Sequence, residues 1–318
     1  MPKVIDILNS SQSPFATFEL VPPLKGSDAT RLYTSLRPIM DLQPPFVNIT
    51  CHRDEVHYSL NADGTYTKLT VAKRPSTIAI VAAIMRKYDV EIVPHVICGG
   101  ASRSKVESEL LDLHFLGIEN VMALRGDAMT GQRYFTAEAD GFSHTNELVS
   151  MIGHLNEGKY LDPSVEEPLP TDFCIGVAAY PEKHYEAANP DTDIFYLKQK
   201  VEAGASYIVT QMFFDNQCFY DFRERCLQAG ITVPIIPGLK PISSARQQEL
   251  LPRAFHIDIP QALVEAIGQA NSADAVYDIG TEWCIEQSRD LIAHGVPAIH
   301  YYTMGKPDNI LRIAKAVF

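Results

Sequence analysis

The segment Val121-Met-Ala-Leu-Arg-Gly-Asp127 is an apolar run that ends in an arginine, a glycine and a carboxylate. In a parallel α/β barrel the bodies of the strands fill the core, and the strand ends open onto the functional site. A strand-like run whose last residues are charged therefore favours a barrel, with Asp127 as the first candidate functional residue. The alternative, equally open at this point, is that Asp127 is a loop residue that caps the next helix.

The same pattern recurs along the chain. From Phe15 onward, short β-branched or aromatic runs alternate with segments of helical period, which predicts a parallel sheet covered by helices. There are about eight such units, the number that closes a barrel. The expected strands are Phe15–Val21, Phe46–Thr50, Glu91–Ile97, Asn120–Leu124, Phe173–Ala179, Tyr207–Phe213, Pro234–Pro237 and Ala298–Tyr302. The helices expected between them include Ser104–Leu116 and Asp193–Ala203.

The fold class that we predict is α/β, a single TIM (β/α)8 barrel with an extra N-terminal helix and loop insertions. Two stretches are interpreted as inserted loops. Residues 57–73 are polar and contain the turn Asn61-Ala-Asp-Gly64, and residues 160–171 are rich in proline and acidic side chains. No break in composition marks a second domain, so residues 1–318 are expected to form one domain.

Composition limits the function. The chain has 318 residues, 46% of them hydrophobic, and a formal net charge of -12. This charge argues against a nucleic-acid or anionic-membrane surface, so small molecules or further copies of the chain are the expected partners. Six cysteines without a C-x-x-C pair indicate reduced thiols. We expect a cytoplasmic protein, because there is neither a signal-peptide pattern nor a run of about 18 apolar residues.

Several familiar motifs are incomplete. Gly153-His-Leu-Asn-Glu-Gly-Lys159 resembles a phosphate-binding loop, but Tyr160 follows the lysine and the segment ends a helical pattern. His52 and His57 lack the spacing of a metal site, so no metal is expected and solvated loop charges are the favoured reading. Neither a G-x-G-x-x-G nor a G-x-S-x-G motif occurs, which argues against a Rossmann dinucleotide site and a serine hydrolase.

Polar residues lie at or near the ends of several predicted strands. They are Glu19, Thr50, His95, Asp127, Tyr180 and Gln211. In a closed barrel these ends converge on one face, so residues far apart in sequence become neighbours. Glu19 stands between Phe18 and Leu20, and a carboxyl group in apolar surroundings is either a paired structural group or an acid with a raised pKa.

Seven short segments together resemble the methylenetetrahydrofolate reductase family, in order and spacing, over nearly the whole chain. They are Phe18-Glu-Leu-Val-Pro-Pro23, Phe46-Val-Asn-Ile-Thr50, Pro94-His95, Leu124-Arg-Gly-Asp127, Ala178-Ala-Tyr-Pro-Glu-Lys-His184, Thr210-Gln-Met-Phe-Phe-Asp215 and Ile235-Ile-Pro-Gly238. The length is similar to that of the bacterial type, a catalytic barrel without the regulatory domain of eukaryotic members.

The resemblance implies a catalytic barrel, residues 1–318, that binds FAD noncovalently at the C-terminal ends of its strands. Members reduce 5,10-methylenetetrahydrofolate to 5-methyltetrahydrofolate, which feeds methionine synthesis, and NADH or NADPH is the co-substrate. The implied mechanism is ping-pong: the nicotinamide gives hydride to the flavin and leaves before the folate binds. The family also implies a homo-oligomer.

The resemblance also implies roles for single residues. Glu19 corresponds to the general acid, Asp127 to a carboxylate beside the flavin and the pterin, and Gln211 to an amide that contacts both folate and nicotinamide. The implied cofactor-binding residues are Thr50, His95, Arg125, Gly126, Asp127, Tyr180, His184, Ala187, Asp193, Tyr196, Gln199 and Lys200. The implied substrate-binding residues are Glu19, Gln211, Gln247, Leu251, Tyr302 and Lys306.

This chain departs from the family pattern at five positions. Cys51, Tyr196 and Gln199 stand where Tyr, Asn and Arg are common, Leu251 where some members have Phe, and Lys306 where an Arg contacts the folate tail. The missing guanidinium at Gln199 predicts looser FAD retention, by roughly 1–3 kcal/mol. Lys306 keeps the charge but loses the bidentate fork.

Two alternatives stay open. One is a barrel that acts on another pterin or a phosphorylated aldehyde, with Lys200 or Lys240 as a reactive amine. The other is a flavin-free ligand-binding barrel without reductase activity, because a fold alone does not fix its chemistry. The sequence does not distinguish NADH from NADPH.

Overall fold

Eight parallel strands close into a barrel in the computed structural model, which describes residues 2–129, 131–304 and 308–318. The neighbours follow the order β1-β10-β9-β8-β7-β6-β5-β2. The barrel strands are β1 (Phe15–Leu20), β2 (Phe46–Ile49), β5 (Glu91–Ile97), β6 (Asn120–Leu124), β7 (Cys174–Ala179), β8 (Tyr207–Met212), β9 (Ile235–Leu239) and β10 (Ala298–Tyr302). The predicted TIM barrel is confirmed, and the first and last residues of each predicted strand lie within two positions of those observed.

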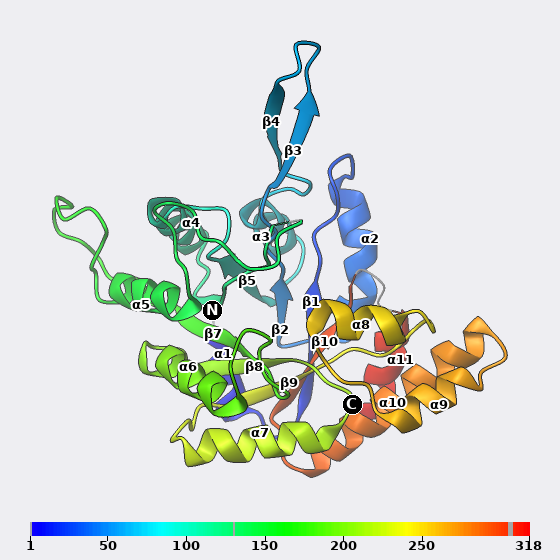
Figure 1. Cartoon of the computed structure of the whole chain (residues 1–318). Coiled ribbons are helices and arrows are strands. Elements are labelled where there is room, and N and C mark those ends of the chain that lie inside the picture. Colours follow the sequence, from blue (N-terminus) through cyan, green and yellow to red (C-terminus); the bar gives the residue numbers. More distant parts are fainter. Residues whose placement is uncertain (1, 130, 305–307) are drawn as a thin grey trace.

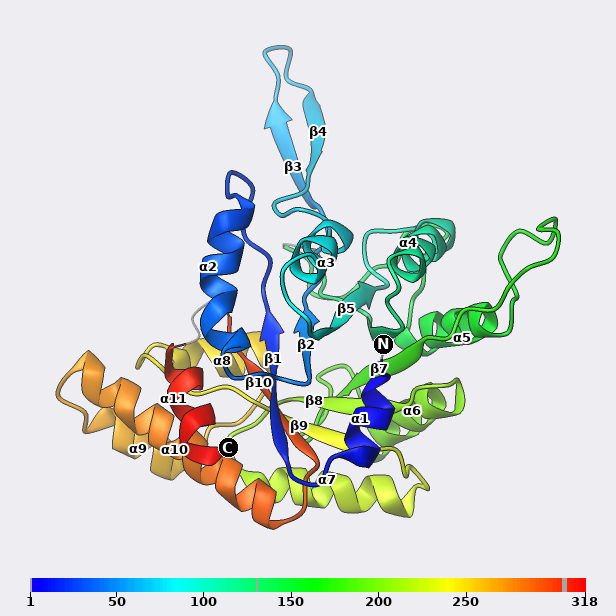
Figure 2. The same cartoon turned by 180° about the vertical axis from the view of Figure 1, so that it is seen from behind.

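Helices surround the barrel, as Figures 1 and 2 show from opposite sides. They are α1 (Val4–Ser10), α2 (Ala29–Met40), α3 (Thr77–Met85), α4 (Arg103–Phe115), α5 (Thr145–Asn156), α6 (Pro190–Glu202), α7 (Asn216–Gln228), α8 (Gln247–Phe255), α9 (Gln261–Gly268), α10 (Ala273–Ala293) and α11 (Asp308–Val317). In the part of the chain that is described, none of them is long and apolar enough to cross a membrane.

The start of α6 corrects the prediction, which placed it at Asp193. The Asn189 side chain accepts a hydrogen bond from the Thr192 amide, and Pro190 occupies the first turn. An asparagine cap followed by proline is a strong helix start, so the helix begins at Pro190, before the first apolar position of its pattern.

Residues 57–73 were predicted to be an inserted loop, and this was wrong. They lie mostly in an antiparallel hairpin of β3 (Glu55–Leu60) and β4 (Tyr66–Val71), which projects from the barrel in both views (Figures 1 and 2). The predicted turn from Asn61 to Gly64 connects the two strands. The second predicted insertion, residues 160–171, has neither helix nor strand.

The half of the barrel interior that lies nearest the starts of the strands, here called the lower half, is apolar; the half nearest the strand ends is called the upper half. Strand residues such as Phe46 and Tyr207 form one buried cluster with Val4 and Leu8 of α1, and the partly buried Phe15 packs against it. The predicted N-terminal helix therefore closes the barrel at the end where the strands begin. The opposite strand faces pack beneath the helices, which leaves the far end of the barrel as the place for polar groups.

Candidate functional site

Two residues further along the same strands, the side chains that face the barrel interior are polar. Glu19 on β1 lies beside Asn48 on β2 and Tyr302 on β10 in the strand register. His95 on β5 places its Nε2 3.9 Å from Glu19 Oε2 and 3.4 Å from Asn48 Nδ2. His300 on β10 is 1% exposed. The structure thus brings together groups from four strands.

The Glu19 carboxyl has no lysine or arginine partner among the described residues. Burial raises its pKa to about 7. The basic group in contact with it, His95, has its pKa lowered to about 3, first by burial and then by the neighbouring His52. His95 is therefore neutral near pH 7, and its contact with Glu19 is not an ion pair. Of the two readings of Glu19, the raised-pKa acid fits and the paired structural carboxylate does not.

Tyr302 is held against the barrel wall. Its hydroxyl donates to the Thr210 carbonyl oxygen at 2.6 Å, and its ring meets that of His300 edge to face, with centroids 5.1 Å apart. A Cβ at Gly238 would lie 2.1 Å from the Thr210 oxygen and 2.7 Å from the Tyr302 ring. Gly238 is thus required by the close packing that orients Tyr302.

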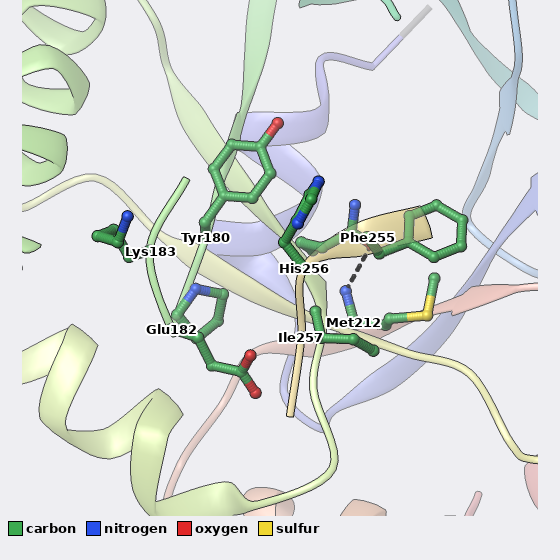
Figure 3. Close-up of a pocket in the computed structure, with 9 residues that line it drawn as sticks. Tyr180, Glu182, Lys183, Met212, Phe255, His256 and Ile257 are labelled. Carbon is green, nitrogen blue, oxygen red and sulfur yellow. Dashed lines mark hydrogen bonds between the residues drawn. The ribbon is translucent and has the colours of Figure 1, made fainter. Parts of the chain in front are cut away.

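Gln211, at the end of β8, lies in a hollow at the barrel mouth. Tyr180, Glu182, Met212 and His256 are among the residues that line it (Figure 3). The Gln211 Oε1 accepts a hydrogen bond from the Met212 amide at 2.9 Å, which fixes the amide plane and leaves its NH2 group as a donor.

The strand β6 ends at Leu124, as predicted, and Arg125, Gly126 and Asp127 follow it. Arg125 is half-buried, donates to Glu186 Oε2 at 2.6 Å and lies 3.5 Å from His184 Nε2. Gly126 has φ +84, in the left-handed region that glycine tolerates. Asp127 is exposed. Burial lowers the pKa of His52, and the Asp127 charge opposes that shift; burial raises the pKa of Tyr180, and the Asp127 charge adds to it.

In the described stretch that follows it, Asp127 caps no helix, because the next described helix, α5, begins only at Thr145. The capping alternative is therefore excluded.

A second polar group lies where β7 passes into α6. The His184 amide donates to Asp193 Oδ2 at 2.8 Å, and the Ala187 amide donates to the His184 carbonyl at 3.0 Å. Lys200 Nζ donates to the Ala178 carbonyl at 2.9 Å. Burial lowers the pKa of Lys200 to about 8, while the Asp193 carboxylate opposes the shift.

Some predicted residues lie outside these two groups. Tyr196 is 51% exposed on α6, and its ring contacts only Phe195 among the aromatic rings of the described residues. Leu251 is 4% exposed and belongs to an apolar cluster under α8 to α10. Gln247 Oε1 accepts from the Ser243 amide at 2.7 Å. Lys306 lies outside the described residues.

Three predicted positions have local partners. The Thr50 amide donates to the Leu20 carbonyl at 3.0 Å, which joins the ends of β2 and β1. Cys51 is half-buried, and burial raises its pKa. Gln199 accepts a hydrogen bond of 3.4 Å from Asn146 Nδ2.

Four residues at the mouth were not predicted. Asn48 and His300 precede the flagged Thr50 and Tyr302 by two positions, so strand alternation was a usable signal for both. Glu182 accepts from the Asp258 amide at 2.8 Å, and burial raises its pKa to about 7. His256 stacks on Tyr185 with ring centroids 4.5 Å apart. Neither contact has a sequence signal, because each joins two loops.

The family model described as methylenetetrahydrofolate reductase matches residues 3–317. The 5,10-methylenetetrahydrofolate reductase of Salmonella typhimurium is 29% identical over 92% of this chain and 86% of that protein. Methylenetetrahydrofolate reductase (NADH) 1 of Arabidopsis thaliana is 30% identical over 95% of this chain and 48% of its own length.

A solved structure has a similar fold. It is an uncharacterized protein from Clostridium thermocellum described as binding two copies of 5-methyl-5,6,7,8-tetrahydrofolic acid, with a TM-score of 0.59 and 16% identity over 98% of this chain and 96% of that one. At this identity the likeness concerns the fold alone. The family model, which spans the barrel and every candidate residue above, decides the assignment: this chain belongs to the methylenetetrahydrofolate reductase family.

Proposed function

We propose that residues 1–318 form one catalytic domain that reduces 5,10-methylenetetrahydrofolate to 5-methyltetrahydrofolate. FAD, bound noncovalently, would carry the hydride, and NADH or NADPH would supply it in a ping-pong sequence. Family membership supports the reaction. The observation that carries the proposal is the largely buried Glu19 carboxyl, whose pKa burial raises to about 7 and which forms no ion pair with a lysine or arginine of the described residues.

The residues at the mouth fit a flavin dinucleotide. Asn48 Oδ1 and His300 Nδ1 are buried and have no hydrogen-bond partner among the described residues, so the interior offers polar atoms to a ligand. Gly126 allows backbone approach to a flat ring system. Arg125 and Lys200 bring positive charge toward the anionic diphosphate. When bound there, the flavin would supply hydride acceptance and donation.

Glu19 is proposed as the general acid. The ring nitrogen that leaves carbon in the folate imidazolidine is a poor leaving group until it is protonated. A carboxyl group with a pKa of about 7 still holds its proton in a large share of molecules near neutral pH. The neutral His95 beside it neither takes that proton as a strong base nor stabilises the carboxylate as a cation.

Asp127 and Gln211 are proposed to orient and stabilise the folate. The exposed Asp127 carboxylate would favour the cationic iminium form of the substrate. The Gln211 amide, with its oxygen already engaged by Met212, presents its NH2 group to the ligand. An amide can also rotate to offer its oxygen, which would let one residue contact both folate and nicotinamide in turn.

The test is to measure the two half-reactions separately in Glu19→Gln. We expect the folate half-reaction to slow by about 10²- to 10⁴-fold, the usual contribution of a general acid, while NAD(P)H oxidation with menadione is unchanged. Glu91→Gln is the matched control, because burial also raises the pKa of Glu91, which lies at the start of β5, at the opposite end of the barrel from Glu19. Equal slowing of both half-reactions, or an equal effect in the control, would refute the assignment to Glu19.

Flavin absorbance at about 450 nm on purification tests the cofactor independently. Protein that neither carries nor rebinds FAD would favour the flavin-free ligand-binding barrel instead.

A further inference from the structure

Two side chains contact the same ring nitrogen in the upper half of the barrel. The Nε2 atom of His95 lies 3.4 Å from Asn48 Nδ2 and 3.9 Å from Glu19 Oε2. Asn48 and His95 are both buried, so bulk water has little access to these contacts. The state of this one nitrogen therefore depends on an amide and affects a carboxyl group.

The strand register fixes the arrangement. Glu19 on β1 is paired with Asn48 on β2, and Asn48 is paired with Val93 on β5, two residues before His95. Residues two positions apart on a strand point to the same face, so all three polar side chains face the interior. The Thr303 hydroxyl donates to the Glu19 carbonyl at 2.7 Å, which also holds the backbone of Glu19. Backbone pairing thus keeps the three groups in place.

The amide of Asn48 determines which nitrogen of His95 carries the hydrogen. Because His95 is neutral near pH 7, one of its ring nitrogens is a donor and the other is an acceptor. The NH2 group of Asn48 can only donate, so the Nε2 atom that it faces is the acceptor and Nδ1 carries the hydrogen. The opposite amide orientation would require an N–H at Nε2, so each tautomer belongs to one orientation of Asn48.

The tautomer of His95 affects the Glu19 carboxyl. A lone pair that faces a carboxyl group disfavours the carboxylate, whereas an N–H in the same place would stabilise the carboxylate by donating to it. The distance of 3.9 Å between His95 Nε2 and Glu19 Oε2 exceeds that of a hydrogen bond. The ring therefore does not bind the Glu19 proton, which stays available for transfer.

We propose that Asn48 is a positioning residue: its NH2 group keeps the lone pair of His95 Nε2, and not an N–H, directed at Glu19, and so keeps the Glu19 carboxyl protonated. The inference rests on the proposed function, in which Glu19 is the general acid. It goes beyond that function because the NH2 group of Asn48 acts on the acid through His95, while its Oδ1 atom remains available to a ligand.

The other groups around Glu19 do not titrate near neutral pH. On β2 and β10, the strands paired with β1, the titratable side chains of the upper half are His300 and Tyr302. Burial and then His95 lower the pKa of His300 to about 3. Burial raises the pKa of Tyr302 well above its ordinary value, and the Glu19 charge adds to the shift. Both side chains are therefore neutral at the pH where Glu19 titrates.

The experiment compares Asn48→Leu with the natural chain by NMR, without any need for turnover. Leucine has a similar volume but no donor, so His95 Nε2 becomes free to take the hydrogen and donate it to the carboxylate. In chains labelled at the histidine nitrogens, we expect Nε2 of His95 to be unprotonated in the natural chain and protonated in Asn48→Leu. In chains labelled at the glutamate carboxyls, the pKa of Glu19 should fall by about one unit, a tenfold rise in its dissociation constant.

Further variants test the route through His95. If Asn48 acts through the imidazole, Asn48→Leu should no longer lower the pKa of Glu19 once His95→Leu is also present. Asn48→Val repeats the change with a smaller side chain and should act like Asn48→Leu. Asn120→Leu is the matched control, because Asn120 is a buried asparagine of β6 that binds the Val4 amide at the opposite end of the barrel. It should leave the pKa of Glu19 unchanged.

Three results would overturn the proposal. They are a hydrogen on His95 Nε2 in the natural chain, a Glu19 pKa that neither Asn48 variant lowers, and a pKa that falls equally without His95. The pH profile of the folate half-reaction separates this inference from the proposed function. Its high-pH limb should move down together with the pKa of Glu19. If the pKa falls in the NMR titration and the limb does not move, the link from Asn48 to Glu19 stands and Glu19 is not the general acid.

Discussion

The lower and upper halves of the barrel interior lie on the same strands, but the lower half is packed with apolar side chains and the upper half contains polar groups with shifted pKa values. On β2, Phe46 packs in the apolar cluster, whereas Asn48 two residues later is buried, and its Oδ1 has no hydrogen-bond partner in the described part of the chain. On β5, Val93 packs below and His95 lies beside Glu19 above. A shift of two residues along one face thus separates the groups that stabilise the barrel from those that burial perturbs, as the raised pKa of Glu19 and the lowered pKa of His95 show.

The largest expected effect is on the lower half. Phe46 is 0% exposed, and its ring meets that of Phe15 edge to face with centroids 5.9 Å apart. Phe46→Ala should lower the free energy of unfolding by about 3–5 kcal/mol, because it removes a buried ring and leaves a cavity. Urea denaturation measures this, and the chain that remains folded should keep its reductase activity. Asn48→Ala on the same strand should cost clearly less. An equal or larger loss there would show that the two halves share the stability.

The fold was readable from sequence because strand ends and core periodicity agree. The run from Asn120 to Leu124 was bounded correctly, since it is apolar and ends in Arg125 and Gly126. The hairpin of β3 and β4 was not predicted, because its polar composition hid the alternating pattern from Glu55 to Leu60. In a sequence, a strand is recognised by the apolar side chains that its buried face requires. The hairpin of β3 and β4 buries few side chains within its own chain, so this signal is weak.

The site was only partly readable. Glu19 stood out as a carboxyl between apolar neighbours, and its raised pKa agrees with that expectation. Leu251 packs in an apolar cluster with Met212 and Ile257, two residues that also line the hollow of Gln211, so its contact with the ligand stays a prediction. The contact between Tyr185 and His256 joins two loops, and no local pattern predicts how loops meet.

The second expected effect is a pH dependence that arises only in the upper half. The ordinary pKa of glutamate is 4.5, and that of Glu19 in the folded chain is about 7. Between these values the folded state binds more protons than the unfolded state, so stability falls as pH rises through this window. The total loss should be on the order of 3 kcal/mol at most.

Glu19→Gln removes this proton equilibrium, so it should become more stable than the natural chain above about pH 7, by that amount at most. His95 and His300 have lowered pKa values and lose stability in the opposite direction, as pH falls, but they are present in both chains and cancel in the difference. Chemical denaturation across the pH range measures the difference. A gap between the two chains that does not change with pH would mean that Glu19 is not perturbed by burial.

The third effect extends the comparison to the rim outside the barrel. Within the described ranges, the side chain of Gln199 makes one hydrogen bond, a long one with Asn146, so little is lost when it is replaced. Gln199→Arg should tighten FAD binding by about 1–3 kcal/mol, roughly 5- to 150-fold, because a guanidinium adds a charge-assisted bond to the diphosphate. Flavin fluorescence titration measures it, with Gln199→Met as the uncharged control. If the arginine variant binds FAD no more tightly than the natural chain, Gln199 does not face the diphosphate.

The smallest expected effect concerns the rim loops. Stacked side chains hold these loops together, whereas a buried apolar cluster stabilises the lower half. His256 has φ +55, and its ring stacks on Tyr185 at 4.5 Å and 22°. His256→Asn keeps a residue that tolerates this backbone but removes the ring, so it should cost about 0.5–1.5 kcal/mol. His256→Ala should cost more, because alanine is less stable in the left-handed region, and His256→Gly separates the two terms. Hydrogen exchange should rise in the loops near Tyr185 and His256 and stay unchanged near Phe46. If all three variants match the natural chain, the stack contributes nothing to the rim, and the Glu182 bond to the Asp258 amide is a contact that still joins these loops.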